Sequence, residues 1–282
     1  MVPGRRRRRP RRPRNPARDP GGELPGARGG VRVIDLRLWV FHVARFSRNG
    51  YFVQLLLTST LGLVALQALA AQAPGARGAE LGWLRAGMVG TWTVCTVAAG
   101  MIGFQRFQGT LVHLVRSPLA PARVLLPVVG AASVFGLAAL PLAAAGSWLL
   151  RQPVALGAVL PMAAAAVVFW LACLSVSAVV GMLFVLTPNA MVYEGLLAVP
   201  LVLVSGVFGT PTGLPSAAVA LAHVLPTRSA VELLHAVVSG APASASLVVG
   251  SVAVSAVWLV VAAWVARVVT RRATTAGTVE LV

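Results

Sequence analysis

Long apolar stretches separated by short polar intervals follow one another along most of the chain. A helix needs about 20 apolar residues to cross the hydrocarbon core of a bilayer. Six stretches of about this length or longer lie at residues 51–71, 86–104, 124–146, 157–186, 190–208 and 247–268. Only 11% of the 282 residues are charged, whereas soluble domains carry about a quarter. The pattern predicts an all-α polytopic membrane protein with six transmembrane helices.

Residues 1–30 have a different composition, with ten arginines among prolines and glycines. Such a segment buries too little apolar surface to offset its chain entropy, so we expect a disordered cytosolic tail. We expect anionic lipids and not nucleic acid as its partner, because no aromatic residues are interleaved to stack on bases. Alternatively, the tail only sets the orientation of the protein. Residues 31–272 form the predicted transmembrane domain, and 273–282 a cytosolic C-terminal tail.

Residues 33–48 have an imperfect amphipathic pattern. At about 100° per residue, Asp35, His42 and Arg45 fall on one side of a helix, and Trp39 and Phe46 fall on the other. We predict an N-terminal interfacial helix on the cytosolic side of the membrane, with Trp39 and the arginines at the level of the lipid headgroups. His42 is expected to be an ordinary residue of the polar face.

All 24 basic residues are arginine, and the sequence contains no lysine. With the N-terminus inside, twenty arginines fall on the cytosolic side, and four fall on the other side: Arg77, Arg85, Arg151 and Arg228. Cytoplasmic loops carry the excess of basic residues in membrane proteins. We therefore expect a multi-pass protein of the cytoplasmic membrane with both termini in the cytosol.

Residues that carry out chemistry are sparse. Of seven acids, only Glu194 lies close to an apolar stretch, where it serves either helix packing or gating, or is an interfacial acid. No carboxylate pair or His-Glu motif is present for a metal, and Cys95 and Cys173 are expected to be buried thiols. The lack of lysine excludes a phosphate-binding loop ending in Gly-Lys-Ser/Thr. We expect no enzyme activity, metal or cofactor in this chain.

The segment from Ser205 to Leu234 is interrupted by residues that stop helices, including Pro215 and Pro226. The apolar piece between these prolines is about half as long as a membrane span, so we predict a half-membrane hairpin before the last helix. Arg228 and Glu232 are four residues apart and suited to an ion pair on one helix face. The alternative is an external loop.

The interval after the second predicted span is short and polar, and runs from Phe104 to Leu119. Its central residues predict a short helix that ends at Ser117-Pro118. The charge distribution places this helix in the cytosol. Alternatively, the interval is only a basic loop.

This interval resembles that of the membrane subunits of ABC-2 type exporters, which commonly show a Glu-Arg-x-x-Gly-Thr-Leu-Glu-x-Leu…Ser-Pro-Leu pattern after the second span. Eight positions match it: Arg106, Gly109, Thr110, Leu111, Leu114, Ser117, Pro118 and Leu119. Gln105 stands where glutamate is usual. A second match resembles the family's half-membrane hairpin and comprises Ser205-Gly206-Val207-Phe208, Leu214-Pro215 and Leu225-Pro226-Thr227.

The resemblance implies one permease subunit of an ATP-driven exporter. It would pair with a second, identical or homologous membrane subunit and with cytosolic ABC ATPase subunits that hold ATP and magnesium. The ATPases would dock on the interval after the second span and move its short helix and the interfacial helix as levers. The substrate stays open among drugs, antibiotics, lipid-linked molecules and polysaccharides. Two other functions are an ATP-independent transporter or channel, and a non-transporting scaffold with a basic tail.

Overall fold

The computed structural model of the chain describes residues 27–74, 78–187, 190–208, 216–241 and 244–275. For residues 27–36 and several residues in 190–221 it describes the backbone only. These residues form helices and connecting turns, and none of them belongs to a strand. The prediction of an all-α protein is confirmed for this part of the chain.

Five helices of the described part are long and apolar enough to cross a membrane. They are α2 (Gly50–Ala70), α3 (Gly82–Phe107, preceded by the 3-10 turn Ala79–Leu81), the joined α5 and α6, α7 (Val159–Leu183) and α11 (Ala245–Thr275). Their positions agree with five of the predicted spans to within a few residues at most ends. The larger differences are at the start of α3 and at the end of α11, which extends to Thr275 inside the predicted C-terminal tail. The chain is therefore a multi-pass membrane protein.

The remaining predicted span, 190–208, corresponds to α8 (Ala190–Ser205), which has 16 residues. Its rise is about 24 Å, whereas the hydrocarbon core is about 30 Å thick. Two shorter helices follow, α9 (Ser216–Val224) and α10 (Pro226–Val238). The count of six spans therefore stays a prediction.

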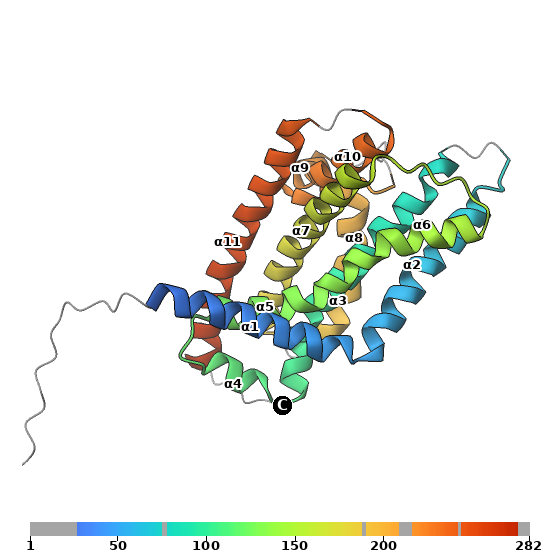
Figure 1. Cartoon of the computed structure of the whole chain (residues 1–282). Helices are drawn as coiled ribbons and strands as arrows, with labels where there is room; N and C mark the ends of the chain where they lie inside the picture. Colours follow the sequence, from blue (N-terminus) through green and yellow to red (C-terminus); the bar gives the residue numbers. More distant parts are fainter. Residues whose placement is uncertain (1–26, 75–77, 188–189, 209–215, 242–243, 276–282) are drawn as a thin grey trace, which may run out of the picture.

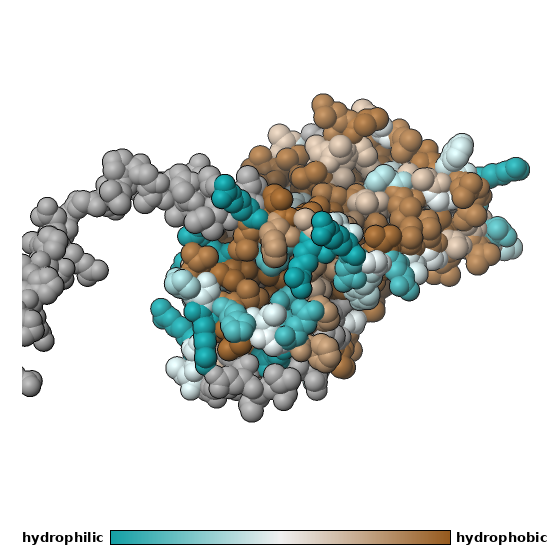
Figure 2. All heavy atoms as spheres, turned by 60° about the horizontal axis from the view of Figure 1, so that its bottom comes forward, coloured by the Kyte–Doolittle hydropathy of each residue, from teal (hydrophilic) through white to brown (hydrophobic). Residues whose placement is uncertain are grey.

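Four helices that are not candidate spans lie at the two ends of the bundle (Figure 1). Helix α1 (Ala27–Ser47) crosses one end, where α4 (Leu111–Val115) also lies, and α9 and α10 occupy the other end. Helix α1 begins inside the predicted tail, and residues 1–26 lie outside the described part. Figure 2 shows hydrophilic side chains gathered at the end that carries α1 and α4, with apolar side chains along the bundle beyond them.

The third span is interrupted between α5 (Pro121–Ser133) and α6 (Ala139–Leu149) by a 3-10 segment, Val134–Ala138. Side chains from α3 and α7 satisfy carbonyls at this break. Thr91 Oγ1 donates to the carbonyl of Gly136 at 2.9 Å, and Trp170 Nε1 donates to that of Ser133 at 3.0 Å. Irregular backbone is tolerated at membrane depth where protein groups satisfy it in this way.

Helix α3 lies at the centre of the bundle, with most of its residues buried, whereas α2 and α11 expose most of theirs. One buried cluster lies toward the α1 and α4 end and joins α3 to α5, α7 and α11. A second cluster joins α3 to α7 and α10. The end of α3 is therefore coupled to most of the other spans.

Candidate functional site

Helix α3 ends in a Schellman motif at Gly109. The Gly109 N–H donates to the carbonyl of Arg106 at 2.8 Å, and the Thr110 N–H donates to that of Gln105 at 2.9 Å. Gly109 has φ +70°, a left-handed conformation in which a side chain is strained. The glycine of the predicted coupling interval thus reverses the chain at the end of a membrane span.

Thr110 connects this turn to α4. Its hydroxyl lies 3.0 Å from the carbonyl of Gln105 and 2.6 Å from the side-chain oxygen Oε1 of the same residue. Its own carbonyl accepts hydrogen bonds from the N–H groups of His113 and Leu114, at 3.1 and 3.3 Å. Gln105 therefore braces the start of α4 with a neutral side chain.

Helix α4 has one anchored face and one open face. Leu111 and Val115 are 1% and 8% exposed and belong to the buried cluster that joins the spans, and Leu114 packs against that cluster. His113 and Pro118 are exposed. The hydroxyl of Ser117 accepts a hydrogen bond from the Leu119 N–H at 3.3 Å. The predicted interval is thus a short helix with an accessible surface and a fixed base.

Arg106 lies at the last turn of α3 and is only 6% exposed. Its guanidinium donates to the carbonyl of Val185, in the turn that follows α7. Hydrogen bonds from charged donors are stronger than neutral ones. Arg106 therefore ties the end of α3 to the end of α7, a contact with no signal in the sequence.

The buried face of α1 agrees with the predicted one at Trp39 and Phe46 but not at His42. His42, predicted on the polar face, is 9% exposed and stacks on Phe46 with ring centroids 5.9 Å apart, whereas Phe41 is 58% exposed. Burial, and then the charge of Arg45, lower the pKa of His42. The prediction for His42 was wrong because the packing of α1 against α5, and not its own weak pattern, decides which side is buried.

Trp39 makes this contact with α5. A Cβ atom built on Gly130 would lie 2.6 Å from Cη2 of Trp39 and nearer still to Cζ2. The indole therefore lies directly on the backbone of α5 at a glycine. Arg45 is exposed, and the side chain of Asp35 lies outside the described part.

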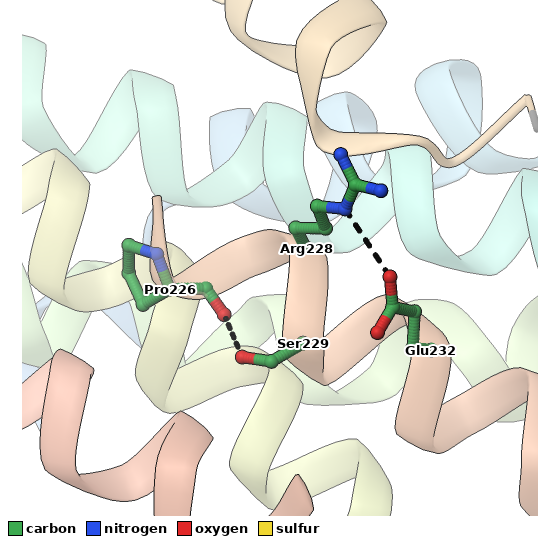
Figure 3. Close-up of polar contacts among 4 residues, drawn as sticks. All are labelled: Pro226, Arg228, Ser229 and Glu232. Carbon is green, nitrogen blue, oxygen red and sulfur yellow. Dashed lines mark hydrogen bonds and ion pairs between the residues drawn. The ribbon is translucent and has the colours of Figure 1, made fainter. Parts of the chain in front are cut away.

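At the other end, Gly206 follows α8 with φ +80°, and Phe208 is 46% exposed. Pro226 is the first residue of α10, as its fixed φ favours. Arg228 Nε lies 3.2 Å from Glu232 Oε1, as the spacing predicted (Figure 3). Pro215 lies outside the described residues.

The remaining candidates are Glu194 and the two cysteines. Glu194 is part of α8, but its side chain lies outside the described part. Cys95 and Cys173 are buried free thiols. Among the described residues, no three of His, Cys, Asp and Glu gather where they would hold a metal ion. The described part of the site is thus a short helix with exposed residues, whose buried face packs against the membrane helices.

Sequence reasoning missed the contacts that give the site its connections. Gly130 and the carbonyl of Val185 carry them. A glycine inside an apolar helix is a weak signal for close packing, and a backbone carbonyl gives none.

The sequence model of one family, described as ABC-2 type transporter, matches residues 37–239. The match covers well over half of the chain and runs from α1 to the end of α10, with the interval of Arg106, Gly109 and α4 inside it. No curated protein and no solved structure matches the chain. A transport role in the membrane agrees with the multi-pass fold, and the chain belongs to the ABC-2 type transporter family.

Proposed function

We propose that this chain is the permease subunit of an ATP-driven exporter in the cytoplasmic membrane. Residues 190–208, which include α8, make the sixth span, and α9 and α10 form a half-membrane hairpin on the outer side. Helix α1 lies in the cytosolic interface, and both termini are cytosolic. The excess of arginine at the α1 and α4 end supports this orientation.

The two-faced α4 carries the proposal. Its open side, with exposed His113, and the exposed Pro118 that follows the helix offer a surface for a cytosolic ABC ATPase. Its other side is fixed in the cluster shared by the spans through Leu111 and Val115. A force applied at α4 is therefore passed to the membrane helices and not lost in a flexible loop.

Two contacts pass this force to further helices. Arg106 joins the turn before α4 to the end of α7, and Trp39 joins α1 to α5 at Gly130. Movement of α4 and α1 by the ATPase thus reaches three spans at their cytosolic ends. Because interfaces between packed helices are bistable and not continuously deformable, small shifts there are amplified.

ATP and magnesium belong to the partner ATPase, because the sequence has no lysine for a phosphate-binding loop. A second membrane subunit, identical or homologous, completes the transport path for the cargo. The cargo is a small amphiphilic compound, a lipid or a polysaccharide.

Purification of the tagged protein from its native membrane in a mild detergent, followed by mass spectrometry, tests the proposal. We expect a stoichiometric ABC ATPase. The Gly109→Val variant should recover roughly 5- to 30-fold less of it, because a side chain at a left-handed residue costs about 1–2 kcal/mol. Gly50→Val is the matched control, since Gly50 has open space around it and no left-handed φ.

If the protein is purified alone even after crosslinking, the exporter proposal fails and an ATP-independent transporter becomes the leading function. If the ATPase is present but Gly109→Val and Gly50→Val recover equal amounts, the docking surface lies elsewhere.

A further inference from the structure

A cleft of about 710 Å³ lies between the C-terminal part of α1 and the last turns of α3. Residues 41–49 form one wall, and residues 101–108 form the other. It belongs to the end of the bundle that carries α1 and α4 (Figure 1). Its volume is within the range of pockets that hold small organic molecules.

The cleft carries positive charge, and no group in the described part of the chain neutralises it. Arg45 and Arg48 both line it, and both are exposed. Within the described part of the chain, neither forms a hydrogen bond or an ion pair. None of the ten lining residues is Asp or Glu. Guanidinium groups are suited to phosphate, which they bind through paired N–H donors.

Apart from three amide side chains, the rest of the cleft is lined by apolar and aromatic residues. Phe41 lines it with a side chain that is 58% exposed, and Met101 and Phe104 line it from α3. A cationic edge beside an exposed aromatic wall matches an amphiphile with an anionic head. A soluble anion would leave the ring of Phe41 in water.

The position of the cleft points to lipid as the source of this amphiphile. It is bounded by the last turns of α3 and by Asn49, which caps the start of α2. Both helices are candidate membrane spans, so the cleft lies where spans enter the headgroup region. Anionic lipids of the cytoplasmic leaflet attract basic residues near the membrane surface.

We propose that this cleft is a binding site for an anionic phospholipid, with Arg45 and Arg48 on the headgroup phosphate and Phe41 and Phe104 against the first part of the acyl chains. The site is distinct from the N-terminal tail. It requires the membrane location of the chain but not the proposed ATP-driven export.

Three variants separate this site from general surface charge. Arg45→Gln combined with Arg48→Gln removes both cations, and both positions are exposed. Arg37→Gln is the matched control, because Arg37 is exposed on the same helix but does not line the cleft. Gln105→Glu adds one negative charge in nearly the same volume, and its carboxylate still accepts the Thr110 hydroxyl.

Native mass spectrometry of the purified full chain, titrated with phosphatidylglycerol or phosphatidylcholine, measures the binding. We expect one phosphatidylglycerol bound at least tenfold more tightly than phosphatidylcholine. Each basic residue near an anionic headgroup contributes about fivefold. The double arginine variant should therefore lose roughly thirtyfold, Gln105→Glu should lose several-fold, and Arg37→Gln should keep the wild-type affinity.

Four outcomes would overturn the proposal. Equal binding of the two lipids, or equal losses in Arg37→Gln and in the double variant, would show general attraction to the surface. Binding of free glycerol phosphate as tightly as phosphatidylglycerol would show a site for a soluble anion. If the double variant keeps phosphatidylglycerol but loses a purified partner ATPase, the cleft is a protein contact.

Discussion

The contact between Trp39 and Gly130 predicts the effect of adding a single methyl group. In Gly130→Ala, the new Cβ would lie 2.6 Å from Cη2 of Trp39, whereas carbon atoms in contact lie about 3.5–4.0 Å apart. The indole or α5 must therefore move by about 1 Å or more. Overpacking of this kind costs typically about 1–3 kcal/mol.

The helix itself gains from the substitution, because alanine favours a helix over glycine by about 1 kcal/mol. Because the added Cβ would lie well inside contact distance, the overpacking cost is in the upper part of that range, at about 2–3 kcal/mol. The net expectation for Gly130→Ala is therefore a loss of about 1–2 kcal/mol in the free energy of unfolding. Gly62→Ala in α2 is the matched control, since nothing lies within 4 Å of its added Cβ. It should be neutral or stabilising by up to about 1 kcal/mol.

Thermal unfolding in one detergent at a fixed scan rate measures both variants. Gly130→Ala should lower Tm by roughly 2–8 °C, since 1 kcal/mol corresponds to about 2–4 °C in a chain of this order of size. In a Trp39→Ala background the same change should no longer destabilise, because the ring is gone. An equal fall of Tm in both backgrounds, or none in either, would refute the contact between α1 and α5.

Three further predictions concern other polar groups. Burial, and then the charge of Arg45, lower the pKa of His42 below its ordinary value of 6.5, so the unfolded chain binds more protons below that pH. The stabilisation from neutral His42 is therefore complete above about pH 6.5 and is lost as the pH falls. The His42→Gln variant should consequently show a smaller fall of Tm between pH 7.5 and 5.5 than the wild-type protein. Arg106→Gln removes a buried charged hydrogen bond to a backbone carbonyl and should cost about 1.5–3 kcal/mol; an unchanged Tm would contradict that bond. The ion pair of Arg228 and Glu232 is partly exposed, with 26% and 52% of the two side chains accessible, so Glu232→Gln should change stability by less than about 0.5 kcal/mol. A loss above about 1.5 kcal/mol would mean that further groups depend on Glu232.

The membrane spans and the short helix after α3 were predictable from local sequence. A span requires only enough consecutive apolar residues, so the positions of five helices follow from composition along the chain. The bounds of α4 follow from Gly109 before it and Ser117-Pro118 after it, because these residues favour helix ends. The pair of Arg228 and Glu232 follows from helical spacing alone.

The face of α1 was only partly predictable, because its apolar and polar positions do not separate cleanly. Trp39 is half-buried on α5, as its side of the helix predicted, but His42 is buried and Phe41 is exposed. The cleft that contains Arg45 and Arg48 also depends on this orientation.

The sequence by itself determined the class of the protein, the places where its helices cross the membrane and the position of the interval that resembles a coupling site. These depend on apolar length and on residues that end helices, which act locally. The tertiary structure alone decided that Arg106 reaches the carbonyl of Val185 and that Trp39 lies on Gly130. Both contacts join residues far apart in the chain, and one uses a backbone group that every residue possesses. Only the packing of whole helices selects such partners.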